Sequence, residues 1–151
     1  MFQQSTLLHY DPLLLQLALF TFIEYKRKIF IPVTLSVDGF LISGELVSAI
    51  EYYQGIAALM PEDNLKKLFE EKAEEAATKA EEISKKTQEA TFNPAAEPIL
   101  QILYLRDAHI LSSTMSAVSG SGNGLWWRCR LSAVTGFNWN SVVLDGAPEE
   151  C

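Results

Sequence analysis

The chain has 151 residues, 48% of them hydrophobic and 21% charged, a composition that predicts one globular domain spanning residues 1–151. Its 19 acidic against 12 basic residues give a net charge of -7, which argues against nucleic acid as a partner, because general polyanion binding needs clustered Lys and Arg. Two cysteines and two histidines are too few for a disulfide framework or a Cys/His zinc site, so we expect neither a metal nor a cofactor.

The most apolar stretch of the sequence, DPLLLQLALFTFI, predicts a helix within residues 11–25. Asp11 is suited to cap its first turn, and Pro12 is suited to its first position. The stretch is shorter than the roughly 20 apolar residues that span a bilayer, and no basic residues precede it as in a secretory signal. We therefore expect a cytoplasmic protein with no transmembrane segment. The helix is predicted to pack between the core and another surface, or else to bind a membrane surface or a partner. Its candidate contact residues are Leu14, Leu17 and Phe20.

Residues 29–48 predict a β-hairpin. Apolar and polar residues alternate from Val33 to Asp38, as they do in a half-buried strand. The pair Asp38 and Gly39 predicts a two-residue turn, because glycine adopts the positive φ that such a turn requires. Gly44 in the second strand predicts a bulge or a sharp bend.

Residues 49–92 predict a helical insertion, made of an apolar helix over Ala49–Met60 and a charged helix over Glu62–Ala90. The charged helix holds nine acidic residues and six lysines, so nearly half of the net charge of -7 belongs to it. Acid-before-base pairs at i,i+4 are expected to stabilise it: Glu62/Lys66, Asp63/Lys67, Glu75/Lys79, Glu81/Lys85 and Glu82/Lys86. Its apolar line is thin and consists of Phe69, Ala73, Ala76, Ala80, Ile83 and Ala90. This pattern favours a solvated helix that projects from the domain, or a coiled-coil contact with a second copy.

Residues 99–144 predict the remaining strands, and residues 145–151 predict a polar tail. The strands are expected over Ile99–Leu105, Leu125–Val134 and Phe137–Leu144, with a turn at Gly136. The stretch Ser112–Gly124 ends in a Gly-x-Gly-x-Gly pattern. We predict a flexible loop there and not a phosphate site, because a strand and not a helix N-terminus follows it.

Alternation along the strand predicted over Leu125–Val134 places Trp126, Arg128 and Arg130 on one face. Aromatic and arginine side chains gathered on one strand face are common at protein interfaces and also stack on nucleic acid bases. We therefore take these three residues as a second candidate interaction surface. The alternative is that the tryptophans belong to the core and that the arginine stems pack over them.

No motif in the sequence assembles a catalytic site. There is no Gly-x-Ser-x-Gly, no phosphate-binding Walker loop, no His-Glu-x-x-His and no recognisable Cys–His pairing. Many of the carboxylates lie in the charged helix beside lysines, a pattern that predicts a solvated helix face. His109, near Asp107, is predicted to be a structural residue in a strand. We therefore expect a protein that is not an enzyme.

The β segments resemble an Sm-like barrel that an insertion has split. That family carries a hairpin with Asp-Gly, Gly and Leu at the spacings of Asp38-Gly39, Gly44 and Leu46, and a third strand similar to Leu103–Ala108. Its fourth strand is similar to Trp126–Cys129. The resemblance implies an α+β fold: a small five-stranded antiparallel Sm-like β-barrel with an N-terminal helix and a long charged helical insertion. It also implies an alternative function, an oligomeric RNA-binding protein that uses Arg106 and Arg128. The RNA-contacting positions of that family depart here, at Ile50, Tyr53, Gln54 and Cys129.

Over roughly residues 30–144 the chain resembles the gas vesicle accessory protein U family. The resemblance is carried by the order TLSVDGFLISGELVSAIEYY, a charged helix, QILYLRDAHIL and WWRCRLSAVTGFNWNSV. It implies a non-enzymatic, cytoplasmic, gas vesicle-associated protein that forms homo-oligomers and contacts vesicle shell proteins, aiding assembly or clustering. A peripheral membrane-associated interaction protein, held by the helix within residues 11–25, is the third hypothesis.

Overall fold

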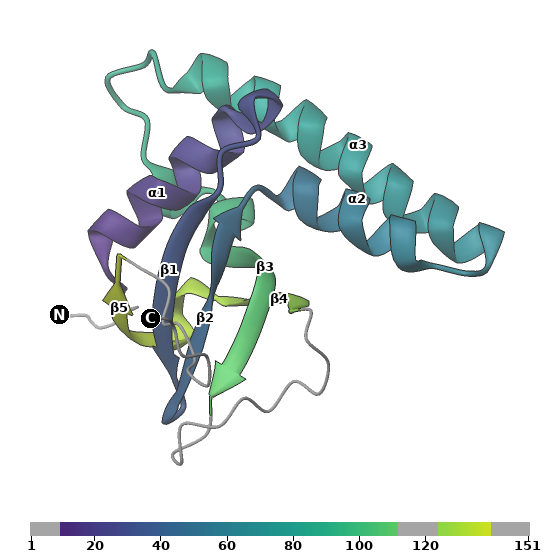
Figure 1. Cartoon of the computed structure of the whole chain (residues 1–151). Helices are drawn as coiled ribbons and strands as arrows, with labels where there is room; N and C mark the ends of the chain where they lie inside the picture. The colour runs from purple at the N-terminus through teal and green to yellow at the C-terminus, as the bar shows by residue number, and fades with distance from the viewer. Residues whose placement is uncertain (1–9, 112–123, 140–151) are drawn as a thin grey trace, which may run out of the picture.

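A computed structural model describes residues 10–111 and 124–139 of the chain. Five antiparallel strands form one sheet in the order β4-β3-β2-β1-β5. Their bounds are Ile31–Val37 for β1, Phe40–Val47 for β2, Ile102–Leu111 for β3, Leu125–Arg130 for β4 and Val134–Asn138 for β5. Three helices accompany the sheet within the described residues: α1 spans Pro12–Ile23, α2 spans Ala49–Leu59 and α3 spans Asp63–Lys86. The predicted combination of helices with a five-stranded antiparallel sheet is confirmed (Figure 1).

The sheet is strongly curved but is open at both edges. In a flat five-stranded sheet the two edge strands would lie about 19 Å apart, at about 4.8 Å per strand. Yet the edge strands β4 and β5 are joined only by the 3₁₀ turn Leu131–Ala133, and a connection of that length covers at most about 14 Å. The sheet must therefore curl to bring its edges together. Since β4 and β5 do not pair with each other, the predicted closed barrel is not confirmed.

Helix α1 begins as the sequence predicts. The Asp11 side chain accepts a hydrogen bond from the backbone N–H of Leu13 at 2.8 Å, and Pro12 occupies the first helical position. The helix contacts β2, α3 and the segment that leads into β3. Its inward face consists of Leu14, Leu15, Ala18, Thr21 and Phe22. Among the described residues, no helix is both long and apolar enough to cross a membrane.

The β1–β2 hairpin confirms the predicted turn. Asp38 and Gly39 both have positive φ, 52° and 83°, as a two-residue turn with the twist of the strands requires. The predicted irregularity at Gly44 is confirmed too, because the register between β2 and β3 shifts between Ser43 and Glu45. A Cβ at Gly44 would lie 3.1 Å from the Cα of Ala108, so the close approach of β3 accounts for the glycine.

Helices α2 and α3 lie side by side as a helical hairpin that extends away from the sheet (Figure 1). Ala73, Ala76, Ala80 and Ile83 of α3 are buried within this chain, so the apolar line of α3 is already covered and leaves no stripe for a coiled coil with a second copy. The five predicted i,i+4 ion pairs are not among the ion pairs of the described residues. The α3 lysines instead reach glutamates at i+3 or beyond the helix.

The later strands differ from the prediction at their boundaries. A 3₁₀ turn over Pro98–Gln101 comes first, so β3 begins at Ile102 and not at Ile99. The predicted turn at Gly136 is wrong: Gly136 lies inside β5 and pairs with Ser36, and the chain turns instead at Leu131–Ala133. The loop predicted before Gly124, the end of the strand predicted over Phe137–Leu144 and the tail at residues 145–151 lie outside the described residues.

Candidate protein interface

The described residues offer no obvious chemistry. They contain no group of three or more His, Cys, Asp or Glu side chains that could hold a metal ion. Burial raises the pKa of the Cys129 thiol to about 11, which keeps it protonated and unreactive near neutral pH. The main polar side-chain clusters among these residues, around Glu97 and around Arg128, join helices to the segments and strands packed against them. The candidate functional features of the described residues are therefore surfaces and junctions between elements.

The junction between the helical hairpin and the sheet is aromatic. The Trp126 ring of β4 packs edge-on against the Tyr52 ring of α2, with centroids 6.2 Å apart, and covers Gly55 in the next turn of that helix. A Cβ at Gly55 would overlap the indole, so only glycine admits the tryptophan at this distance. Tyr52 also contacts Tyr104 of β3, with centroids 5.1 Å apart. This cluster connects α2 to the sheet.

Arg128 completes the junction from the exposed side. Its Nη1 donates a hydrogen bond to the hydroxyl of Tyr53 at 3.1 Å, and its guanidinium carbon lies 5.8 Å from the centroid of the Tyr52 ring. Burial alone lowers the pKa of Arg128, but Tyr53, Tyr52 and Tyr104 together raise it above its ordinary value. Burial also raises the pKa of Tyr104, and Tyr53 raises it further. The arginine is therefore a permanent cation, held in place by the hydroxyl of Tyr53 and the ring of Tyr52.

The residues predicted as contact surfaces fall into different environments. Leu14 is fully buried, so it belongs to the core and is not available on the surface; Leu17 is half-buried, and Phe20 is exposed. Trp126 is half-buried on α2, whereas Arg128 and Arg130 are exposed at the sheet edge. The structure thus brings Trp126 and Arg128 together against α2 and leaves Phe20 apart on α1.

Arg106, which the RNA-binding alternative requires, is occupied within the chain. Its Nε donates to Oε1 of Glu45 at 2.6 Å, and its guanidinium carbon lies 3.6 Å from the centroid of the Phe30 ring. The charge of Arg106 is already paired with a carboxylate, so a phosphate would have to compete with Glu45 for it. The geometry therefore weakens the RNA-binding alternative independently of net charge.

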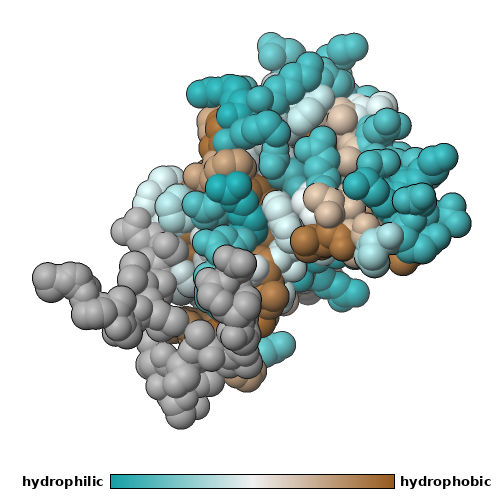
Figure 2. Space-filling view, turned by 45° about the vertical axis from the view of Figure 1, so that its right-hand side comes forward, coloured by the Kyte–Doolittle hydropathy of each residue, from teal (hydrophilic) through white to brown (hydrophobic). Residues whose placement is uncertain are grey.

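A surface that sequence reasoning missed lies at the far end of the helical hairpin. Leu59 on the last turn of α2 is 64% exposed, and Leu65 and Leu68 on the first turns of α3 are 46% and 45% exposed. We call these three residues the hairpin-end leucines. Figure 2 shows hydrophobic surface interrupting the mostly hydrophilic surface on the side toward which the hairpin extends. The sequence signal is the pair of leucines at i,i+3 outside the alanine line of α3.

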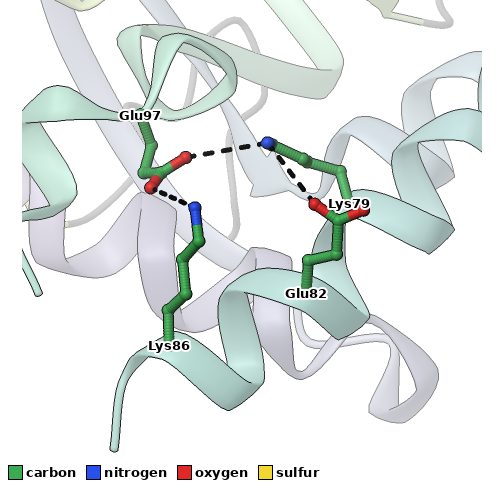
Figure 3. Close-up of polar contacts among 4 residues, drawn as sticks. All are labelled: Lys79, Glu82, Lys86 and Glu97. Atoms are coloured by element: carbon green, nitrogen blue, oxygen red, sulfur yellow. Dashed lines mark hydrogen bonds and ion pairs between the residues drawn. The ribbon is translucent and has the colours of Figure 1, made fainter. Parts of the chain in front are cut away.

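The other end of α3 is secured by a nearly buried carboxylate. Glu97 in the segment before β3 has a side chain only 12% exposed. Its two oxygens face the ammonium groups of Lys86 at 3.3 Å and Lys79 at 3.9 Å, and Lys79 also pairs with Glu82 at 3.6 Å (Figure 3). Two cations around one shielded carboxylate fix the return of the chain from α3 to the sheet. This cluster is structural.

A comparison with known protein families found a match to the family described as gas vesicle protein GvpU-like, over residues 14–142. The chain belongs to this family. The match begins within α1 and covers the hairpin-end leucines, the Glu97 cluster and the five described strands, so the family model spans nearly all of this fold. Membership confirms the resemblance drawn from the strand motifs and relates the chain to gas vesicles. Searches of curated proteins and of solved structures gave no match.

Proposed function

We propose that this chain is a non-enzymatic gas vesicle accessory protein that self-associates and contacts vesicle shell proteins, aiding their assembly or the clustering of vesicles in the cytoplasm. The observation that carries the proposal is that exposed large apolar side chains form two groups at separate places of one domain: Leu13 and Phe20 on α1, and the hairpin-end leucines. Phe40, Leu125 and Trp139 are exposed elsewhere. A protein that joins partners needs two contact surfaces, and exposed apolar groups are the usual mark of such surfaces.

The hairpin end is suited to contact a second copy of the chain. Along the start of α3 two acidic residues, Glu62 and Asp63, precede Leu65, and two basic residues, Lys66 and Lys67, follow it. In an antiparallel contact between two copies centred near Leu65, the acids of one copy come opposite the lysines of the other. The exposed leucines supply the apolar centre of that contact, and the charges supply its rim.

The outer face of α1 is suited to an apolar partner. No charged residue occurs between Pro12 and Ile23, and Leu13 and Phe20 on this helix are 53% and 42% exposed, with Leu17 half-buried between them. A helix face without charge gains affinity chiefly by burying apolar area, at about 25 cal/mol per Å². We assign the contact with a vesicle shell protein to this face.

Two substitutions test the two contacts separately. Leu65→Glu is expected to weaken self-association by about tenfold or more, since it puts a charge at an apolar contact centre. Phe20→Glu is expected to abolish co-flotation of the purified protein with purified gas vesicles while leaving self-association intact. Sedimentation velocity over a range of protein concentrations measures the first effect, and centrifugal flotation measures the second.

Phe40→Glu is the matched control, because Phe40 is similarly exposed, at 46%, but lies at the β1–β2 turn. The control variant should behave as the unsubstituted protein in both assays. If Phe20→Glu and Phe40→Glu float with vesicles equally well, α1 is not the vesicle contact. A protein that stays monomeric at every concentration would contradict the proposed self-association.

A further inference from the structure

The strand β4 is an edge of the sheet. It pairs with β3 on one side, and no described strand pairs with its other side. About half of the backbone N–H and C=O groups of an edge strand point away from its neighbour and can accept a further strand. Such an edge is the backbone half of a site for an extended segment, which binds by adding a strand.

The side chains of β4 give this edge a definite charge. The sequence contains four arginines, of which Arg27 and Arg106 each pair with a carboxylate. Arg128 and Arg130 take part in no ion pair within the described residues, although the protein as a whole carries a net charge of -7. Both side chains are exposed. They are two residues apart, so they lie on the same face of β4, the face that also carries Trp126. Two cations with no ion-pair partner in the described part of the chain therefore lie at alternate positions of this strand.

Arg128 is also held in position before any partner arrives. Its hydrogen bond to Tyr53 and the ring of Tyr52 beside it fix the guanidinium, and a guanidinium has five N–H donors in all. The fixed side chain loses little conformational entropy on pairing with a carboxylate. This hydrogen bond goes to a hydroxyl and not to a carboxylate, and no carboxylate among the described residues pairs with Arg128.

We propose that the outer edge of β4 binds an extended acidic segment of a partner protein, which adds a strand to the sheet and places carboxylates at alternate positions opposite Arg128 and Arg130. The β5 edge of a second copy does not fit this charge, because Val134–Asn138 contains no acidic residue. A single-stranded nucleic acid would offer phosphates to the arginines but no strand-forming backbone to the edge. This inference goes beyond the proposed vesicle role and holds whether or not α1 and the hairpin end act as described.

The test uses the full chain and a synthetic peptide, acetyl-Thr-Glu-Val-Glu-Val-Glu-Thr-amide, whose acids alternate with β-branched residues. Fluorescence anisotropy of the labelled peptide should show saturable binding, and Arg130→Gln should weaken it by about tenfold, the effect of one charge-assisted pair. Arg128→Gln should weaken it by at least as much. Arg27→Gln, which changes an exposed arginine in the 3₁₀ turn Tyr25–Arg27 after α1, is the matched control and should leave the affinity unchanged. A peptide with Gln in place of each Glu should bind about a hundredfold more weakly.

Hydrogen exchange locates the binding and can overturn the proposal. Peptide binding should slow amide exchange in Leu125–Arg130 and leave exchange in Val134–Asn138 unchanged. Protection of β5 alone, equal binding of the Glu and Gln peptides, or no peptide binding at all would each overturn it. So would a uridine oligonucleotide that binds the same edge with a steep salt dependence while the acidic peptide does not bind. If protection of the β4 amides increases with protein concentration in the absence of peptide, the edge binds a second copy of the chain, and the proposal is overturned.

Discussion

The contact between Gly55 and Trp126 can be tested by a substitution that ordinarily stabilises a helix. Gly55 lies in the interior of α2, where replacing glycine by alanine is normally favourable by about 0.5–1 kcal/mol. Here the added Cβ would overlap the indole of Trp126, which packs on the helix from β4. Inserting a methyl into a packed contact costs about 1–3 kcal/mol. Because the Cβ would lie far inside the contact distance of the indole, the upper part of this range, about 2–3 kcal/mol, applies. Less the propensity gain of about 0.5–1 kcal/mol, we expect Gly55→Ala to lower the free energy of unfolding by about 1–2.5 kcal/mol, the reverse of the usual sign.

Equilibrium unfolding in urea, followed by far-UV circular dichroism, measures this difference. Substituting Trp126→Leu removes the overlapping ring, and in that background Gly55→Ala should raise the free energy of unfolding by about 0.5–1 kcal/mol. Ala58→Gly, at an exposed position of the same helix, measures the effect of helix propensity by itself. It should lower the free energy of unfolding by about 1 kcal/mol. If Gly55→Ala stabilises the unsubstituted protein, or acts identically in both backgrounds, the packing of Trp126 on Gly55 is not as described.

Three further outcomes are expected. Gly39→Ala should lower the free energy of unfolding by about 1 kcal/mol in urea titrations, purely from its φ of 83°, because open space surrounds that position. Glu97→Gln should cost about 1–2 kcal/mol by the same method, and less in molar salt, since the two lysines around the carboxylate lose their partner but remain partly hydrated. A cost that does not change with salt would contradict the ion-pair account. The raised pKa of Cys129 predicts that iodoacetamide modifies it at pH 8 at least about tenfold more slowly in the folded protein than in urea, measured by mass spectrometry in a Cys151→Ser background. The pKa of this thiol is 9.0 in the unfolded chain and about 11 in the folded protein, so the folded state binds the proton more tightly. The contribution of the thiol to stability is therefore complete below pH 9 and falls as the pH rises from 9 to 11.

The sequence predicted the elements whose causes are local. The cap at Asp11 and the turn at Asp38 and Gly39 are each set by hydrogen bonds and dihedral angles within a few residues, and all appear where expected. The bulge at Gly44 was also predicted, although its cause is the approach of β3. The prediction was possible because a glycine within a strand commonly marks a bulge or a close approach of another backbone.

Candidate contact residues were less predictable, and α1 shows why. Apolar residues surround this helix, so no periodicity distinguishes its inner face from its outer face. The packing of α1 on β2 and α3 buries Leu14 and leaves Phe20 exposed, a choice made only by the partners of the helix. The same ambiguity applies to α3. From the sequence, its line of alanines could pack within the chain or against a second copy, and the structure shows that residues of the same chain cover it.

By itself the sequence determined the cap of α1 and the turn of the β1–β2 hairpin, that the chain combines helices with an antiparallel sheet, and to which family it belongs. Only the tertiary structure decided that the sheet curls without closing, that Trp126 packs on Gly55 and that Glu97 faces two lysines. It also decided that Arg128 and Arg130 lie at a sheet edge with no ion-pair partner among residues 10–111 and 124–139. Propensities, caps and alternation act over a few neighbouring residues, and one sequence records them directly. Which faces are buried and which charges meet depends on residues brought together from distant parts of the chain, and these contacts leave no pattern in a single sequence.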